Sequence, residues 1–330
     1  MVRFALMGAG RIGAMHARNI QASHRATLTR VFDVAEPAAN TVADQTGATA
    51  VTRVEEALGE DVDAVLIASS TDTHVDLLTA ATKAGKAVLC EKPIDLDMAR
   101  VDACWSEIGP LNPIVQLGFN RRFDPSFRSL RERLQRGLIG RPEQLIIISR
   151  DPGPPPKGYL EVSGGLFRDM TIHDFDLARF FLGEFDEVYA TGAALFDQNA
   201  KALDDIDSAM IVLRARSGAL CHINNSRRAV YGYDQRIEIH GTEGMIQAGN
   251  WRATSVEIFG ADTTAAKDPL LDFFIERYAQ AYVDELDHFI DCVTGRTPPS
   301  VGFEDGRRAL ALADAAFTSL REGRPVTLDG

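Results

Sequence analysis

The 330-residue sequence has few cysteines and no long hydrophobic run. Its four cysteines, Cys90, Cys104, Cys221 and Cys292, lie far apart and form no C-x-x-C pair. This spacing favours reduced thiols over a disulfide framework or a structural zinc site. No apolar stretch approaches the roughly 20 residues of a membrane span, and no leader-like segment precedes the first predicted strand. We therefore expect a soluble, cytoplasmic protein.

Basic residues are also in the minority. The 35 lysines and arginines face 47 aspartates and glutamates, which gives a formal net charge of −12. Such a surface argues against nucleic acid or an anionic membrane as a partner. The hydrophobic and charged fractions, 45% and 25%, are ordinary for a globular protein. A chain of this length can form two domains, each with its own core.

The strongest motif lies at the start of the chain. An apolar strand is predicted over residues 2–7, and a second over residues 27–32 that ends on Asp33. Between them stands a G-x-G-x-x-G motif that opens a helical pattern, made of Gly8, Ala9, Gly10, Arg11, Ile12 and Gly13. Strand, glycine motif, helix, second strand and terminal acid have the order and spacing of a dinucleotide-binding βαβ unit.

Each part of this motif has a physical role. Gly8 allows the tight turn, Gly10 lets the backbone approach a pyrophosphate, and Gly13 lets the helix pack closely on the strand. Arg11 and Ile12 begin the helix, whose N–H groups and dipole attract phosphate. The carboxylate of Asp33 would accept hydrogen bonds from ribose hydroxyls and repel a 2′-phosphate. We therefore predict NAD rather than NADP as the cofactor.

Further buried strands are predicted over residues 64–68, 87–90 and 114–119, each separated from the next by a helical pattern. Such alternation predicts a doubly wound, mostly parallel sheet. Ser69 and Thr71 follow one of these strands, at the sheet edge where ligands bind. His74 opens the next helix, and the sequence leaves open whether its ring is solvated or contacts the cofactor.

The pattern changes after residue 119. Seven strands without intervening helices are predicted at 144–149, 187–194, 207–214, 219–226, 235–240, 244–248 and 254–259. Turns at 216–218 and 241–244 predict antiparallel hairpins, with a helix at 170–182 laid across the sheet. Two long helices (273–294 and 304–322) and a short strand (325–328) end the chain. The fold class is thus α/β, a Rossmann domain (1–119) followed by an α+β domain with a large open, mostly antiparallel sheet (120–330). Whether the last helix packs back on the first domain stays open.

A nicotinamide enzyme that oxidises an alcohol needs a base within hydrogen-bond reach of the hydroxyl. No tyrosine has a lysine four residues later, and no histidine–cysteine cluster predicts a catalytic metal. Asp169 and His173 are four residues apart, so a helix would put them on one face, where the carboxylate could orient the imidazole. The alternative is a capping aspartate beside a structural histidine.

Lys92 is a second candidate for chemistry. It follows the strand 87–90 in the sequence Glu91-Lys92-Pro93, at the edge where the reactive end of a nicotinamide cofactor would lie. Its ammonium could stabilise charge on the reacting oxygen. The alternative is an exposed lysine at a strand end, and the sequence leaves a cis bond before Pro93 open.

These motifs together resemble the Gfo/Idh/MocA family of oxidoreductases over essentially the whole chain. Segments 118–124, 149–152, 164–176 and 226–234 are more narrowly similar to the inositol dehydrogenases of that family. The resemblance implies a catalytic triad of Lys92, Asp169 and His173, with His173 as the general base. It also implies that Glu91, Ser69, Thr71 and His74 join the glycine loop in binding NAD.

For the substrate, the resemblance implies a polyol pocket lined by Arg122, Asp151 and Tyr233, because each buried hydroxyl needs a polar partner. Some inositol dehydrogenases carry His and Asn where Ser149 and Asp151 stand here, which leaves the preferred isomer open. Family members often form homotetramers by pairing the open sheets of the second domain.

The expected activity is NAD-dependent oxidation of a cyclic polyol, with myo-inositol converted to 2-keto-myo-inositol (scyllo-inosose). The alternatives are a scyllo-inositol or pyranose sugar dehydrogenase of the same family, and a non-catalytic NAD-bound sensor. No metal is expected.

Overall fold

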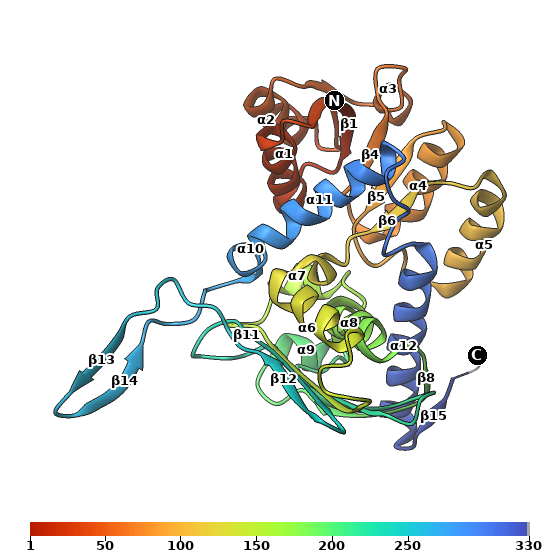
Figure 1. Ribbon diagram of the computed structural model, residues 1–330. Helices are drawn as coiled ribbons and strands as arrows, with labels where there is room; N and C mark the ends of the chain where they lie inside the picture. The colour runs from red at the N-terminus through yellow and green to blue at the C-terminus, as the bar shows by residue number, and fades with distance from the viewer. Residues whose placement is uncertain (329–330) are drawn as a thin grey trace. The chain divides into compact units, whose positions relative to one another are not determined.

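The structure is a computed structural model that describes residues 1–328 (Figure 1). Its residues form two compact units. Unit 1 contains Met1–Phe123 and Gln280–Leu310, and unit 2 contains Asp124–Ala279 and the chain from Ala311 onward. Residues 280–310, which the sequence analysis assigned to the second domain, therefore belong to the first unit.

Unit 1 is built on a six-stranded sheet in which all strands are parallel. The strand order is β3-β2-β1-β4-β5-β6, so the order reverses between β1 and β4. Strands β4 and β5 are completely buried, as expected when helices cover both faces. The predicted doubly wound sheet is confirmed. The strands are β1 (Val2–Met7), β2 (Ala26–Phe32), β3 (Thr49–Val51), β4 (Ala64–Ile67), β5 (Ala87–Cys90) and β6 (Val115–Leu117).

Helices alternate with these strands along the chain. They are α1 (Arg11–Ala22), α2 (Glu36–Thr46), α3 (Val54–Ala57), α4 (His74–Lys83) and α5 (Met98–Ile108), with short 3-10 turns η1 (Thr71–Thr73), η2 (Gly109–Leu111) and η3 (Asn120–Phe123). Unit 1 also takes most of α11 (Ala279–Val293) from the far end of the chain. Its apolar residues Leu286, Phe289 and Ile290 join the core around β1 and β4, which explains why this helix belongs with the parallel sheet.

Unit 2 is built on an open seven-stranded sheet of order β12-β11-β7-β10-β9-β8-β15. Neighbouring strands are antiparallel except β7 and β10, which are parallel. The mostly antiparallel sheet and both expected hairpins are thus confirmed. The strands are β7 (Pro142–Arg150), β8 (Phe185–Ala193), β9 (Ser208–Ala215), β10 (Leu220–Ser226), β11 (Asp234–Gly241), β12 (Gly244–Ala248) and β15 (Val326–Thr327).

One face of this sheet is buried and the other is exposed. In β9, Ile211 and Leu213 are buried, whereas the alternating residues Met210 and Val212 are 55% and 45% exposed. The helices of unit 2 are α6 (Pro125–Gln135), α7 (Lys157–Leu160), α8 (Ile172–Leu182), α9 (Gln198–Ala202) and α10 (Phe274–Arg277). Helix α8 contacts β7, as expected of a helix laid across the sheet. The last helix, α12 (Phe303–Glu322), is divided between the two units at residue 310.

Three local expectations differ from the structure. The predicted helix 170–182 begins with a π-helical turn, η4 (Phe167–Thr171), and becomes α-helical only at Ile172. The predicted helix 273–294 is interrupted at Tyr278, between α10 and α11. The predicted strand 254–259 does not join the large sheet. Instead β13 (Glu257–Gly260) pairs with β14 (Thr263–Lys267) as a separate hairpin, which extends away from the sheet of unit 2 in Figure 1.

Two further findings concern the chain as a whole. All four cysteines are free and buried. Within residues 1–328, no helix is both long and apolar enough to cross a membrane.

Candidate active site

The glycine loop connects β1 to α1 and has the geometry that phosphate binding requires. Gly8 has φ +102°, and a Cβ there would meet the backbone of Ser69 at 2.4 Å. A Cβ on Gly13 would lie 1.9 Å from the carbonyl oxygen of Gly8. Beside Gly10, by contrast, no atom lies within 4 Å of an added Cβ. The loop is therefore tightly packed on its inner side and open at Gly10.

The start of α1 is available for an anion. Helix α1 begins at Arg11 and continues through Ile12 and Gly13, with Gly10 as its N-cap. No side chain caps it and its first turn contains no acidic residue. Its first N–H groups and positive dipole end therefore face the open side of the loop, and these features fit a pyrophosphate.

Asp33 is tied to this loop. Its Oδ2 accepts a hydrogen bond from the backbone N–H of Ala9 at 2.6 Å, and its Oδ1 accepts one from the N–H of Ala35 at 2.8 Å. The structure therefore brings the acid at the end of β2 together with the glycine loop. A carboxylate held in this position fits the adenine-side ribose of NAD and disfavours a 2′-phosphate.

His74 is not the solvated residue that one alternative assumed, because it is only 2% exposed. Its Nδ1 lies 2.7 Å from the carbonyl oxygen of Pro93, and its Nε2 lies 3.1 Å from that of Ser69. Burial lowers the pKa of the imidazole, against smaller opposing effects of the two carbonyls. His74 thus connects the loop after β4 to the turn after β5. In the same loop, the hydroxyl of Ser69 lies 2.7 Å from that of Thr73, in the 3-10 turn that Thr71 begins.

The turn after β5 carries Glu91, Lys92 and Pro93. The peptide bond between Lys92 and Pro93 is cis. Lys92 is half-buried, which excludes the alternative that it is a fully exposed lysine at the end of a strand. Glu91 Oε1 lies 2.8 Å from Nε2 of His16, in α1. Unit 1 therefore gathers the glycine loop, Asp33, His74 and the Glu91–Lys92 turn around the carboxyl ends of its strands.

In unit 2, Asp169 is held by two residues that the sequence analysis did not identify. The hydroxyl of Tyr159 donates to its Oδ1 at 2.7 Å, and both terminal nitrogens of Arg227 lie 3.1 Å from its Oδ2. Asp169 lies inside the π-helical turn, and α8 has no side-chain cap. The alternative of a capping aspartate is therefore wrong, and the simple α-helical register assumed for Asp169 and His173 does not apply.

Arg227 is one of the largest fully buried side chains, at 1% exposure. Burial opposes its charge, but the nearby carboxylates of Asp169, Asp151 and Asp205 outweigh that effect and raise its pKa. A guanidinium with this donor geometry fixes the carboxylate that it binds. The structure thus brings Asp151 and Asp169 into the field of one buried cation.

His173 is half-buried in the first turn of α8. The next residue, Asp174, is completely buried and accepts a hydrogen bond from the amide of Asn225 at 2.8 Å. The hydroxyl of Thr171 donates to the same amide's oxygen at 2.7 Å. These contacts fix the start of α8 to β10 and so restrict the orientation of His173.

The three predicted substrate residues have different surroundings. Arg122, in unit 1, is 9% exposed and pairs with Asp305 at 2.9 Å. Asp151 follows β7 in unit 2, and its N–H donates to the carbonyl oxygen of Ser226 at 2.9 Å. Tyr233, also in unit 2, is 4% exposed and packs edge-on against Phe273 and Tyr278. Within unit 2, Asp151 lies with the Asp169 group, whereas Tyr233 lies in an aromatic cluster.

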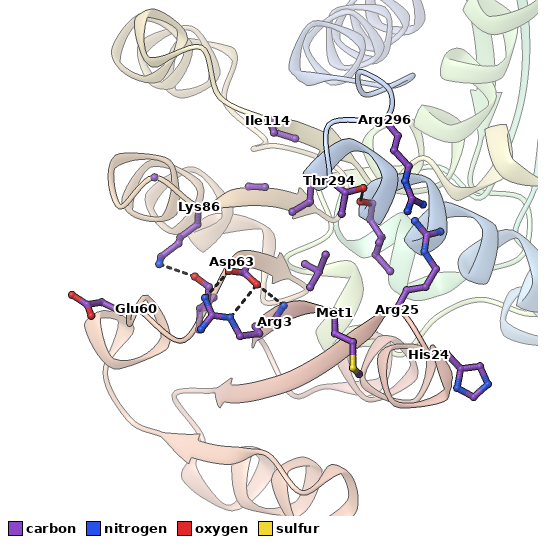
Figure 2. A pocket seen from close by; sticks show the side chains of 16 residues that line it. Met1, Arg3, His24, Arg25, Glu60, Asp63, Lys86, Ile114, Thr294 and Arg296 are labelled. Carbon is purple, nitrogen blue, oxygen red and sulfur yellow. Dashed lines mark hydrogen bonds and ion pairs between the residues drawn. The ribbon is translucent and has the colours of Figure 1, made fainter.

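Unit 1 also has a pocket of about 850 Å³ (Figure 2). It is lined by residues near the amino ends of β1 and β5, including Arg3, Lys86 and Arg296, so it opens at the opposite edge of the sheet from the glycine loop. Its cations are paired: Arg3 binds Asp63 at 2.7 Å, and Lys86 donates to two carbonyl oxygens. None of the predicted site residues lines it. In the described part of the chain, no three His, Cys, Asp or Glu residues form a group that could hold a metal ion.

A doubly wound sheet with an open glycine loop, together with a second unit bearing a fixed Asp, Arg and His group, defines a dinucleotide-dependent enzyme of two units. Comparison with known proteins agrees. Residues 2–119 match the oxidoreductase family with an NAD-binding Rossmann fold, and residues 127–247 match the GFO/IDH/MocA C-terminal domain. The chain therefore belongs to the GFO/IDH/MocA family of oxidoreductases, and NAD is its cofactor, as predicted.

The relatives include inositol dehydrogenases. An inositol 2-dehydrogenase of Rhizobium meliloti is 46% identical, over 99% of both chains. The crystal structure of a myo-inositol dehydrogenase from Corynebacterium glutamicum has a TM-score of 0.97 and 47% identity, covering 100% of this chain and 99% of that one. A scyllo-inositol dehydrogenase from Lactobacillus casei, solved with NAD(H) and scyllo-inositol, has a TM-score of 0.91 and 28% identity over 99% of both chains. The predicted resemblance and fold class are confirmed.

Proposed function

We propose that this protein oxidises myo-inositol to 2-keto-myo-inositol with NAD. The proposal rests on the names of its relatives and on one structural observation. Asp169, four residues before His173, is held by buried Arg227 in the unit that is distinct from the NAD-binding Rossmann unit. A fixed carboxylate and an oriented imidazole suit proton removal from a hydroxyl. We assign cofactor binding to residues 1–119 and substrate binding to residues 120–330, apart from the segment 280–310 that packs in unit 1.

The glycine loop suits cofactor binding because Gly8, Gly10 and Gly13 leave space at Gly10 for the pyrophosphate. In the proposal, Arg11 and Ile12 supply backbone N–H groups and Asp33 binds the adenine-side ribose. Ser69, Thr71 and Glu91 lie at the carboxyl ends of β4 and β5 and contact the nicotinamide half. His74, whose ring nitrogens face two carbonyl oxygens, supports these loops from within. When bound, NAD supplies the hydride acceptor.

Lys92, Asp169 and His173 form the catalytic group of the proposal. The imidazole of His173 takes the proton of the reacting hydroxyl, while the hydride leaves the carbon that bears this hydroxyl. The ammonium of Lys92 donates a hydrogen bond to the reacting oxygen and stabilises negative charge on it. Asp169, whose position Tyr159 and Arg227 fix, orients the imidazole of His173.

Arg122, Asp151 and Tyr233 complete the proposal as substrate residues. A guanidinium, a carboxylate and a phenol offer donors and acceptors to several ring hydroxyls. The bound ligand of the Lactobacillus casei enzyme favours scyllo-inositol as the second candidate substrate.

We also propose a homotetramer. Five exposed apolar side chains line the outer face of the large sheet, and pairing of two sheets would cover them: Tyr189, Met210, Val212, Leu220 and Met245. Native mass spectrometry tests this assembly, and Val212→Asp should dissociate it. The four free cysteines support a reducing compartment, and we place the protein in the cytoplasm.

NADH absorbance measured with myo-inositol, scyllo-inositol, D-chiro-inositol, D-glucose and L-glucose tests the activity. Selective turnover of myo-inositol supports the proposal. Turnover of scyllo-inositol or of sugars alone would change the assigned substrate but leave the assigned catalytic residues unchanged. NAD binding without turnover of any compound would contradict the enzyme proposal and favour an NAD-bound sensor.

A further inference from the structure

The amide of Asn225 is a buried contact between β10 and the start of α8. The residue is 2% exposed. Its Oδ1 accepts a hydrogen bond from the hydroxyl of Thr171 at 2.7 Å, and its Nδ2 donates to Oδ2 of Asp174 at 2.8 Å. The same nitrogen also donates to the carbonyl oxygen of Ser149, in β7, at 3.3 Å. Both ends of this amide are therefore engaged.

The chemistry of these partners fixes the orientation of the amide. A backbone carbonyl can only accept a hydrogen bond, so the nitrogen of Asn225 must face Ser149. The oxygen of Asn225 then faces Thr171, whose hydroxyl donates. Thr171 and Asp174 are both completely buried, and a buried polar group that loses its partner is costly. The chemical identity of residue 225, and not only its size, therefore matters.

Thr171 and Asp174 lie on either side of His173 in the chain. They are three residues apart, with Thr171 as the N-cap of α8, so both lie on the helix face that meets Asn225. His173 is half-buried and projects about 100° around the helix axis from Asp174. The amide of Asn225 therefore fixes the backbone on both sides of His173.

The same amide belongs to a polar row that crosses three neighbouring strands. Asn225 of β10 is in register with Ser149 of β7, and Ser149 is in register with Gln235 of β11. The hydroxyl of Ser149 donates to Oε1 of Gln235 at 3.1 Å, and all three side chains are buried. Arg227 and Asp151 each follow two residues later, just past the ends of β10 and β7. Asn225 therefore connects the start of α8 to these two strand ends.

We propose that Asn225 is a positioning residue for the oxidation of the polyol, and that its amide holds the start of α8 where His173 acts as the general base. The inference rests on the proposed function, because that function gives His173 this role. It adds a residue of β10 that the proposed function does not use. A displacement of a reacting group by about 1 Å can lower a rate about 10²-fold. The loss of Asn225 should therefore lower kcat, whereas the affinity for NAD should stay nearly unchanged because the glycine loop belongs to the other unit.

The first experiment compares two replacements of similar size. Asn225→Leu removes both ends of the amide and should lower kcat about 10- to 100-fold. Asn225→Asp keeps the acceptor for Thr171 but places a second carboxyl group against Asp174. Two such groups share a proton when the pH is low enough, and at alkaline pH both ionise and repel each other. The kcat of Asn225→Asp relative to wild type should therefore rise as the pH falls from about 9 to about 6, whereas that of Asn225→Leu should stay constant.

Asn224→Asp is the matched control. Asn224 precedes Asn225 in β10 and projects to the opposite face of the sheet, where its Oδ1 accepts a hydrogen bond from Arg150 at 3.0 Å. This variant adds the same charge to the same strand and should keep the wild-type kcat at every pH. The thiol of Cys221 in β10 stays neutral, because burial and the charge of Asp174 raise its pKa well above the ordinary value. Equal relative kcat for Asn225→Asp and Asn225→Leu across the pH range would overturn the proposal.

A second pair of variants keeps the test decisive if the Asn225 variants do not fold. Thr171→Val removes the donor hydroxyl at nearly unchanged volume, and Thr171→Ser keeps it. Thr171→Val should lower kcat about five- to tenfold, and Thr171→Ser should restore most of it. Wild-type kcat in Thr171→Val would overturn this inference alone. A wild-type protein that oxidises no polyol would overturn the proposed function and this inference with it.

Discussion

The carboxylate of Asp33 and the backbone N–H of Ala9 are joined by a hydrogen bond of 2.6 Å. This bond connects the end of β2 to the glycine loop and leaves the acid beside the expected ribose site. In the proposed assignment, the cofactor preference and the shape of the loop therefore depend on the same side chain.

Replacing Asp33 should change both the affinity for NAD and the discrimination against NADP. Asp33→Ala removes hydrogen bonds to a charged acceptor, so we expect the Kd for NAD to rise about 10- to 100-fold. Discrimination against NADP should fall, because no carboxylate remains to repel a 2′-phosphate. Binding assays with both cofactors measure this. Asp44→Asn, an exposed change in α2, is the matched control. An unchanged ratio of NAD to NADP affinity would contradict the assigned role.

His173 should be required for chemistry but not for cofactor binding. We expect His173→Ala to lower kcat by about 10²- to 10⁴-fold, because the general base is lost. Lys92→Ala should cause similar damage. NAD titration should give a nearly unchanged Kd for His173→Ala. His24→Gln, which alters an exposed histidine of unit 1, controls for nonspecific effects. Normal turnover in His173→Ala would disprove the assignment.

The pair of Arg227 and Asp169 should contribute strongly to both stability and activity. Arg227→Met leaves a nearly buried carboxylate without its cation, and we expect a loss of about 3–5 kcal/mol in the free energy of unfolding. Adding Asp169→Asn should recover much of that stability but not kcat. Arg214→Met breaks a solvent-exposed pair with Glu187 and should change stability by less than about 1 kcal/mol. Denaturant unfolding followed by steady-state kinetics separates the two effects.

His74 should affect the turn that carries Lys92 indirectly. Its ring connects the carbonyl oxygens of Ser69 and Pro93, so His74→Ala removes both contacts and leaves a cavity. We expect a lower Tm and a kcat reduced by about tenfold or more, since Lys92 adjoins Pro93. His74→Gln can keep one donor and should fall between wild type and the alanine variant. Equal kcat in all three proteins would show that the connection is only structural.

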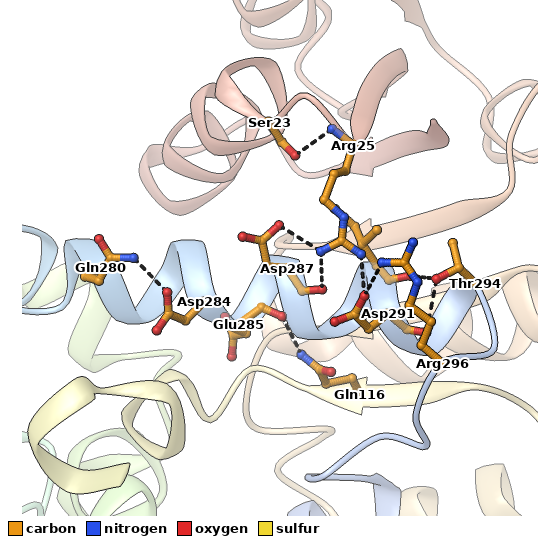
Figure 3. Close-up of polar contacts among 11 residues, drawn as sticks. Ser23, Arg25, Gln116, Gln280, Asp284, Glu285, Asp287, Asp291, Thr294 and Arg296 are labelled. Carbon is orange, nitrogen blue, oxygen red and sulfur yellow. Dashed lines mark hydrogen bonds and ion pairs between the residues drawn. The ribbon is translucent and has the colours of Figure 1, made fainter. Parts of the chain in front are cut away.

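Glu285 of α11 is completely buried, and Gln116 of β6 donates from its amide to the backbone oxygen of Glu285, as Figure 3 shows. This acid should make stability depend on pH. Its folded-state pKa is raised by burial, so its contribution to stability is fully present below the unfolded pKa and is lost as the pH rises toward the folded value. Glu285→Gln should therefore be more stable than wild type at about pH 8, and this advantage should shrink toward about pH 5. Thermal unfolding across that range tests the sign. A glutamine variant less stable than wild type at about pH 8 would show that Glu285 is ionised and paired.

Much of unit 1 could be predicted because its signals are local. Continuous apolar runs such as residues 64–67 mark buried parallel strands, and the glycine spacing marks the loop. The contacts of Asp169 could not be predicted in this way. Arg227 is 58 residues away and meets it only after β10 and the π-helical turn have formed. The place of Leu286 and Phe289 in the core of unit 1 depends on packing across most of the chain, so periodicity could identify their helix but not its partner.

The three glycines of the loop also differ in whether they can be substituted without disturbing the fold. At Gly8 and Gly13 a single added methyl group collides with backbone, so any substitution there disturbs the fold itself. Gly10 has φ −70° and ψ −168°, an extended conformation open to any residue, and an added Cβ meets no protein atom within 4 Å. Alanine at this position would extend only into the open space that we assign to the pyrophosphate. We therefore expect Gly10→Ala to fold normally and to bind NAD weakly, which makes it a reference protein for measurements without bound cofactor.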